Sequence, residues 1–244
     1  MSKFVPSTWQ DFPPVLAARF GLKAGKQRTM SHEGHLVLVL HHPPKASEVE
    51  RRAAIFWRNP SGTWKAGGEA KGGLGALKAL VESFTKEALA LETALESATQ
   101  AADYFRILQE VAPRLRSARG LHRTLQEARE LLKSESEIIS LRDQAYEAER
   151  TFELVQQDAS AGLDFTVARR AEEQAALQER IAKSSHRLNL IAALFLPISA
   201  LGGIFGANLS HGLETAGAPF LFWAFVASAL VLGLFVRSTV ASVK

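Results

Sequence analysis

The residues best suited to chemistry stand where an uncharged run ends, in the stretch GGIFGANLSHGLE. Three glycines, Gly202, Gly203 and Gly206, let the backbone come close to a neighbouring helix or to an ion path. Asn208 then places an amide side chain, which both donates and accepts hydrogen bonds, just after them. The role of this amide depends on what the uncharged run is.

Four histidines near the N-terminus, His32, His35, His41 and His42, are the other candidate ligands. Their spacing does not match the HExxH motif and the chain has no cysteine, so a zinc site is the weaker alternative there. No serine–histidine–acid set and no pair of carboxylates has a spacing that supports catalysis. We therefore expect neither an enzyme nor a bound cofactor.

Two uncharged runs, residues 188–207 and 215–236, predict a hairpin of helices through a membrane. Each run is long enough to cross a hydrocarbon core of about 30 Å. Lys183 and Arg187 precede the first run and Arg237 follows the second, whereas the connection between the runs has no Lys or Arg. The positive-inside rule then predicts an integral protein of the inner or plasma membrane with both termini in the cytoplasm. The absence of a signal-peptide core and of cysteine agrees with a cytoplasmic N-terminal region.

The sequence before the membrane runs begins with a small basic head. Residues 1–72 hold 11 basic and 5 acidic side chains, whereas residues 73–187 hold 16 basic and 19 acidic ones. The segments HLVLVLHH and RRAAIFWRNPSGTWKA predict a strand and a hairpin, and so a small α/β head. A head of this size is expected to share its core with neighbouring helices or sister subunits. The glycine-rich AGGEAKGGLGALK matches no phosphate-binding loop and predicts a flexible linker.

Beyond the linker, apolar residues recur in steps of four and three, which predicts long helices. We expect a first helix, then a second that starts at Pro113, runs to about Asp158 and pairs with the first in antiparallel fashion. The segment DASAGLDF, residues 158–165, is the next expected break.

A third helix of about forty residues is predicted to pass from charged sequence into the first uncharged run. One face of it keeps an unbroken stripe of mostly small and polar residues: Ala168, Ala171, Ala175, Gln178, Ala182, Ser185, Asn189, Ala192, Leu196, Ser199 and Gly203. Such a stripe serves either close packing between helices or the lining of a narrow pore, and periodicity alone does not choose between them. The second run has no comparable stripe and is expected to face lipid.

The segment RLNLIAALFLPISALGGIFGANL resembles the first transmembrane helix of the CorA-type divalent-cation transporters. In that family FLP or FMP stands mid-span and a GxN motif ends the helix. Phe195, Leu196 and Pro197 match the first feature, and Gly206 to Asn208 match the second, with Ala207 where methionine is common. The similarity is strong over about 60 residues, from Lys183 to the C-terminus. The long helices match more loosely.

The resemblance implies a homopentamer in membrane lipid whose first spans surround a pore, with no nucleic-acid partner. By position, it places Ser185, Leu188, Ala192, Leu196 and Ser199 along the path, and the stripe adds Asn189 and Gly203 on nearly the same face. The entrance filter is then formed by Gly206, Ala207 and Asn208.

The implied cargo is a divalent cation, most simply Mg²⁺, with Co²⁺, Ni²⁺ and Zn²⁺ left open. Mg²⁺ sheds water reluctantly. A ring of five Asn208 side chains, one from each subunit, would accept hydrogen bonds from the water shell of the ion and still let the ion leave. The family senses cytoplasmic Mg²⁺ through acidic pairs between subunits. Asp143, Glu147, Asp158 and Asp164 are acidic candidates here, but none aligns with such a site, and the head is shorter than in typical members.

The expected fold class is a mainly α membrane protein with a small N-terminal α/β head, a helical stalk and a C-terminal hairpin. In chain order we expect the head over 1–72, the helix pair over 73–160, the stalk and first span over 161–208, an external loop over 209–218, the second span over 219–237 and a cytoplasmic tail over 238–244. The alternative is a CorA-like membrane effector or scaffold, gated by another signal through the reduced head.

Overall fold

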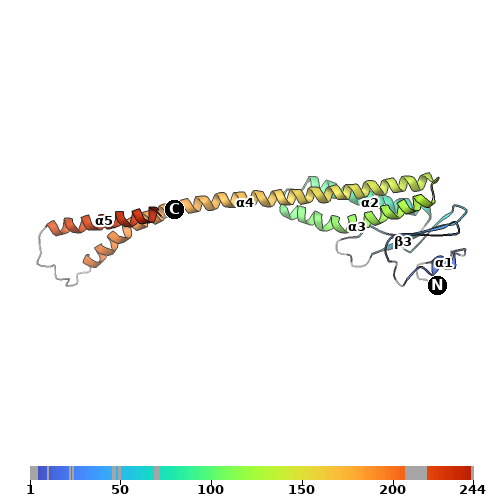
Figure 1. Cartoon of the computed structure of the whole chain (residues 1–244), viewed down its shortest axis with the longest axis horizontal. Helices are drawn as coiled ribbons and strands as arrows, with labels where there is room; N and C mark the ends of the chain where they lie inside the picture. Colours follow the sequence, from blue (N-terminus) through green and yellow to red (C-terminus); the bar gives the residue numbers. More distant parts are fainter. Residues whose placement is uncertain are drawn as a thin grey trace. The chain divides into compact units, whose positions relative to one another are not determined.

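The chain is mainly helical, with a small antiparallel sheet near its N-terminus and one very long helix (Figure 1). The structure is a computed structural model, and it describes residues 5–9, 11–21, 23, 25–45, 48, 51–68, 72–206 and 219–242. The chain divides into two compact units, an N-terminal unit of residues 1–168 and a C-terminal unit of residues 169–244.

Four strands form the sheet in the order β1–β2–β3–β4, each antiparallel to the next. Their bounds are Arg28–His32 for β1, His35–His41 for β2, Ala53–Arg58 for β3 and Trp64–Gly68 for β4. The predicted strand and hairpin are thus confirmed as β2 and as β3 with β4. Strand β1 was not predicted. It joins β2 through Glu33 and Gly34, whose φ values of 47° and 78° are those of a two-residue hairpin turn.

Both faces of the sheet are buried, because side chains alternate between the faces of a strand. Leu36, Leu38 and Leu40 of β2 belong to a core shared with the long helices. Val37 and Val39 belong to a second core with the segment around the short helix α1, Pro14–Ala17. The expectation that the head shares its core with helices is confirmed.

Three helices, rather than two, complete the N-terminal unit: α2 (Leu74–Glu96), α3 (Ala101–Leu131) and the first part of α4 (Ser136–Gly206). The expected helix from Pro113 to Asp158 is wrong at both ends. Pro113 lies inside α3, which begins at Ala101. The helix ends at Leu131, and the next helix begins at Ser136. The apolar repeat nevertheless continues across this interruption, because α3 and α4 both face one core.

The break predicted at residues 158–165 is also wrong, since α4 continues through it. Ala159 is fully buried in the shared core. A Cβ atom built on Gly162 would stand only 2.5 Å from Cε1 of Tyr104, a residue of α3. The small residues of this segment therefore admit a neighbouring side chain and do not mark a loop.

The prediction of a flexible, glycine-rich linker is wrong for those of its residues that the structure describes. Gly67 and Gly68 lie in β4, and Gly73 directly precedes α2. A Cβ atom on Gly73 would clash with the Trp64 carbonyl oxygen, and the amide of Ala66 donates a hydrogen bond of 2.6 Å to the carbonyl of Gly72. These glycines allow a close approach of strand and helix.

The C-terminal unit contains the rest of α4 and helix α5, Pro219–Ser242. The prediction of one helix passing without a break from charged sequence into the first uncharged run is confirmed, with Pro197 inside it. Within the described residues, none of the helices has the length and apolar character that a membrane crossing requires. Residues 207–218, which include Ala207, Asn208 and the expected external loop, lie outside the described residues.

Candidate functional site

The predicted pore-lining residues all lie on α4, and all are exposed in the single chain: Ser185, Leu188, Asn189, Ala192, Leu196, Ser199 and Gly203. At about 100° per residue they fall within about 60° of Ala192 around the helix. The two leucines are the bulky members, with 63% of Leu188 and 66% of Leu196 exposed. Within the described residues, one continuous face of α4 is therefore left uncovered.

Helix α5 packs on a different face of α4. Ala193 is buried and Leu194 and Pro197 are half-buried, and these three positions lie about 100° to 160° from Ala192 around the helix. On α5, Ala229 is buried, and a Cβ atom on Gly233 would stand 3.0 Å from the Leu194 carbonyl oxygen. Small residues therefore do mediate close helix packing here, but they are not the residues of the stripe.

The filter residues are described only in part. Gly206 ends α4 and is exposed, and a Cβ atom built there, or on Gly202 or Gly203, would meet nothing within 4 Å. Ala207 and Asn208 lie outside the described residues, so their role remains a prediction.

The part of α4 that precedes the uncharged run carries charges, and none of the elements that the structure describes covers it. Every residue from 167 to 189 is exposed. Arg169 pairs with Glu173 at 3.1 Å, and Lys183 pairs with Glu179 at 2.7 Å, both four residues apart. A helix that is exposed all round in a single chain relies on such pairs or on contacts with other copies.

Two of the four acidic candidates share a groove. Asp143 and Glu147 line a cavity of about 460 Å³ with Thr85, Ser136, Ile139, Ser140 and Gln144. The groove is open and most of the surface that lines it is apolar, so these two carboxylates do not make it a metal site. Asp158 and Asp164 are exposed elsewhere on α4 and do not join it. Across the described residues, no three His, Asp or Glu side chains are grouped so as to hold a metal ion.

The N-terminal histidines have separate surroundings. His35 stacks on Trp57, whose Nε1 donates to its Nδ1 at 3.1 Å, and His32 lies 3.8 Å from Glu33. His41 is buried at the opposite end of β2, where burial and the charge of Arg51 lower its pKa. The structure does not bring the four rings together as one ligand set.

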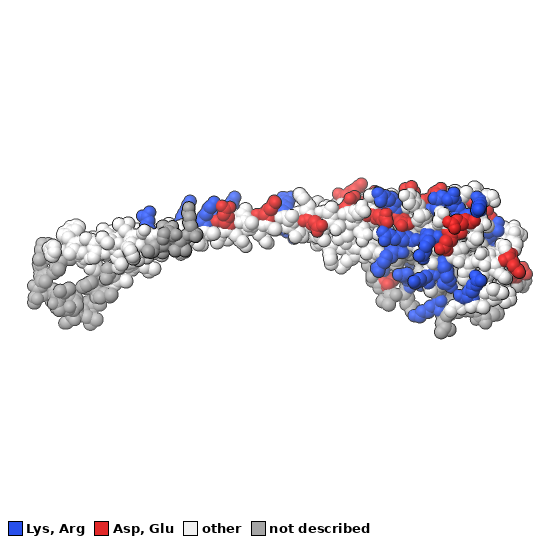
Figure 2. Space-filling view, viewed as in Figure 1, with Lys and Arg blue, Asp and Glu red and all other residues white. Residues whose placement is uncertain are grey.

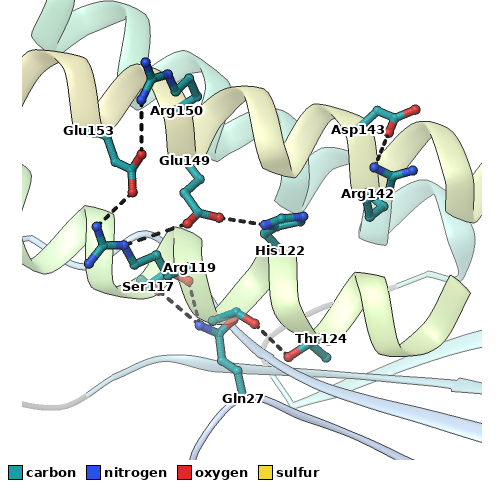
Figure 3. Close-up of polar contacts among 11 residues, drawn as sticks. Gln27, Ser117, Arg119, His122, Thr124, Arg142, Asp143, Glu149, Arg150 and Glu153 are labelled. Atoms are coloured by element: carbon teal, nitrogen blue, oxygen red, sulfur yellow. Dashed lines mark hydrogen bonds and ion pairs between the residues drawn. The ribbon is translucent and has the colours of Figure 1, made fainter. Parts of the chain in front are cut away.

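A polar network between α3 and α4 was missed by sequence reasoning (Figure 3). Arg119 donates to Glu153 at 2.8 Å, and His122 Nδ1 lies 2.7 Å from Glu149. The hydrogen bond from Arg119 lowers the pKa of Glu153, and Arg150 adds to the effect. The sequence signal was the spacing of the two carboxylates, four residues apart on one helix face. The network fixes the pairing of α3 with α4.

A buried amide ties the sheet to the same helix. Gln27 Nε2 donates to the Ser117 carbonyl oxygen at 2.8 Å (Figure 3). Gln27 Oε1 accepts from the amide of His41 at 3.3 Å. Gly120 lies against this side chain, and a Cβ atom there would clash with it. The end of β2 is therefore connected to α3 through one side chain.

Solved structures are similar in fold to this chain, although the chain matches no family profile and no curated protein sequence. The CorA magnesium transporter from Methanocaldococcus jannaschii aligns with a TM-score of 0.50 at 12% identity, over 97% of this chain and 85% of that one. The full-length CmaX protein aligns with a TM-score of 0.47 at 14% identity, over 96% and 84% of the two chains. At these identities the comparisons concern the fold, and the chain is similar in fold to the CorA magnesium transporter.

Proposed function

We propose that the chain forms a channel-type pathway for divalent cations, most simply Mg²⁺, in a membrane-embedded homo-oligomer, with five copies expected. The observation that carries the proposal is the face of α4 from Ser185 to Gly203, which is neutral, mostly made of small residues and not covered by α5. Copies of the chain placed around an axis would bring these faces together. The similarity in fold to a magnesium transporter supports this choice of cargo.

Membrane insertion is supported by the side chains around the rest of the C-terminal unit. The uncharged runs 188–207 and 215–236, which both extend beyond the described residues, are each long enough to span a bilayer. Large apolar side chains cover the described parts of both helices and are more than half exposed: Phe195, Phe220, Phe222, Trp223 and Phe235. Removing such surface from water contributes about 25 cal/mol per Å², which favours a lipid surrounding.

In the proposed pathway, the entrance filter and the stripe have separate roles. An Asn208 ring would receive the ion with its water shell, because a neutral amide binds weakly enough to release it. Leu188 and Leu196 would form apolar rings that close the path by excluding water. A divalent cation gains about 4.6 kcal/mol per 100 mV on entering the cytoplasm, so the passage needs no nucleotide.

Uptake into proteoliposomes that enclose a Mg²⁺-sensitive dye tests the proposal. The wild-type chain should admit Mg²⁺, and Asn208→Ala should lower the initial rate by about tenfold or more, because the ring loses its hydrogen-bond acceptors. Ser228→Ala is the matched control, since the Ser228 hydroxyl bonds to carbonyls of its own helix. No uptake by the folded oligomer would reject the channel and favour the effector or scaffold alternative.

A further inference from the structure

Cationic side chains stand where the charged part of α4 meets the first uncharged run. Arg180, Lys183 and Arg187 are all exposed, and Arg187 is the last residue before the run begins at Leu188. Figure 2 shows Lys and Arg side chains on the long helix next to the uncharged part of the C-terminal unit. We call Arg180, Lys183 and Arg187, together with Arg237 of α5, the boundary cations. The proposed ion pathway does not use them.

The three boundary cations of α4 share one face of the helix. They are spaced by three and four residues, and at about 100° per residue they lie about 120° to 180° from Ala192 around the axis. The predicted pore-lining residues lie within about 60° of Ala192, on the opposite side. In an oligomer whose pore-lining residues face the axis, the boundary cations therefore point outward.

Arg237 reaches the same level from the second helix. Helix α5 runs back along α4 within the C-terminal unit (Figure 1), and Gly233 lies against the Leu194 carbonyl oxygen. Arg237 follows Gly233 by one turn, so in this antiparallel pair it lies level with about Leu190 of α4. Leu190 is three residues from Arg187, which is about 4.5 Å along the axis. Both helices thus contribute a cation to one end of the pair.

Acidic side chains are scarce around the boundary cations. The sequence has no Asp or Glu from residue 180 to residue 213 and none after Glu214. Lys183 pairs with Glu179 at 2.7 Å. Among the described residues, Arg180, Arg187 and Arg237 have no carboxylate within ion-pair distance. An anion supplied from outside the chain can therefore reach three guanidinium groups without displacing an acidic side chain.

The spacing of these cations fits the headgroup layer of a bilayer. This layer is about 5–7 Å thick on each side of the hydrocarbon core. Lys183 and Arg187 are about 6 Å apart along the helix, and Arg180 lies about one turn further out, from where its long stem can reach back. The negative charge of the layer is carried by phosphate groups, whose geometry guanidinium groups match.

We propose that the boundary cations bind the headgroups of anionic phospholipids on the cytoplasmic side of the membrane. The inference rests on the membrane embedding in the proposed function, but it does not depend on ion conduction or on Asn208. It goes beyond the orientation of the helices, because it requires that an anionic lipid is preferred to a zwitterionic one at this position. Lipid bound there contacts the face of α4 opposite the predicted pore.

The test places a fluorophore beside the boundary cations in the full-length chain. Because the chain has no cysteine, Ser184→Cys gives a single attachment point at an exposed position. The labelled chain is reconstituted in phosphatidylcholine vesicles that contain increasing amounts of either phosphatidylglycerol or phosphatidylcholine with the same spin label high on the acyl chain. Quenching at equal mole fraction compares the two headgroups.

The variants neutralise either the boundary cations or a matched pair elsewhere. Arg180→Gln combined with Arg187→Gln, and separately Arg237→Gln, remove cations at the boundary. Arg116→Gln combined with Arg123→Gln is the control, since both arginines are exposed on α3 and the net charge changes equally. Raising the salt concentration is a second measurement, which needs no variant at a boundary cation.

Spin-labelled phosphatidylglycerol should quench the wild-type chain at an about fivefold lower mole fraction than phosphatidylcholine, the equivalent of one cation near an anionic surface. The double variant at the boundary should lose most of this preference, Arg237→Gln should lower it, and the α3 control should keep it. The preference should also shrink at high salt, because exposed charges are screened.

Equal quenching by the two lipids, a preference that survives the double variant, or one that ignores salt would overturn the proposal and leave the membrane embedding intact. Absence of quenching by either lipid would overturn the membrane embedding as well.

Discussion

Gly233 of α5 lies against the backbone of Leu194 in α4, with 3.0 Å between the Leu194 carbonyl oxygen and the position that a Cβ atom on Gly233 would take. Replacing glycine by alanine should therefore have opposite effects on stability at this crowded site and at an open one. Gly233→Ala should destabilise the chain by about 1–3 kcal/mol, because the backbone of α4 must move. Gly75→Ala, where a Cβ meets nothing within 4 Å, should stabilise helix α2 by about 0.5–1 kcal/mol. Thermal unfolding in detergent measures both, and a stabilising Gly233→Ala would contradict the close packing.

Gly162 makes a similar demand within the N-terminal unit, because the ring of Tyr104 occupies the place of a side chain. Gly162→Val should displace this ring, break its hydrogen bond of 2.9 Å to the Ala98 carbonyl and cost about 1–3 kcal/mol. Tyr104→Phe is the control, and it should cost only about 1 kcal/mol for the lost hydrogen bond. Thermal unfolding midpoints should rank Gly162→Val below Tyr104→Phe, and the reverse order would count against the packing.

The pair of Arg119 and Glu153 predicts part of the acid sensitivity. The folded-state pKa of Glu153 is lowered by its hydrogen bond from Arg119, so the pair stabilises the fold above the unfolded pKa of about 4.5. This contribution is lost as pH falls through the lower folded pKa. Since Arg119 is largely exposed, Glu153→Gln should cost at most about 1 kcal/mol at pH 7.

Urea unfolding at pH 7 and pH 3 checks this prediction. The difference between wild type and Glu153→Gln should shrink at the lower pH, and a double-mutant cycle with Arg119→Gln isolates the pair. An unchanged difference at pH 3 would show that the carboxylate charge is not responsible.

His41 predicts a second loss of stability, nearer neutral pH. Its folded-state pKa is lowered, first by burial and then by Arg51, so the fold favours the neutral ring. Stability is then complete above the unfolded pKa of about 6.5 and declines as pH falls through the folded pKa. His41→Gln should flatten this decline between about pH 6.5 and pH 5, while His186→Gln, on the exposed part of α4, should not. The thermal unfolding midpoint across this range is the measurement.

The apolar rings of the proposed pathway predict a gain of flux. Leu196→Ser should raise the basal rate of Mg²⁺ uptake several-fold, about threefold or more, because a hydroxyl ring holds water in the constriction. Ile191→Ser is the control, since Ile191 is also exposed on α4 but lies about 100° from Ala192 around the helix. Equal effects of the two substitutions would place Leu196 outside the path.

The sequence was sufficient where one local pattern decided the structure. The apolar run of β2 and the turn before Trp64 predicted strands because residues with strand propensity were bounded there by turn residues. The unbroken stripe predicted the continuity of α4 into the uncharged run. The predicted pore-lining residues, from Ser185 to Gly203, were also expected to share one face of the helix, and they do.

Other features depended on contacts between distant segments. The heptad pattern runs across the break before Ser136, since two helices can share one core without sharing one axis. The residues Ser160 to Asp164 have the composition of a helix start, but Gly162 is needed by Tyr104. Strand β1 lacks an apolar alternation, and its Thr29 hydroxyl instead donates to the Thr124 carbonyl of α3 at 2.8 Å. The filter at Ala207 and Asn208 stays a prediction.

The burial of β2 on both faces sets limits on how the sequence can change in evolution. Leu36 to Leu40 have at most 2% of their surface exposed, so a polar replacement at any of the five would leave a buried group without partners. In the exposed part of α4, residues 167–189, a polar replacement buries no polar group within the chain. Among diverged relatives, the strand should therefore retain its apolar residues, while this part of the helix exchanges one polar residue for another.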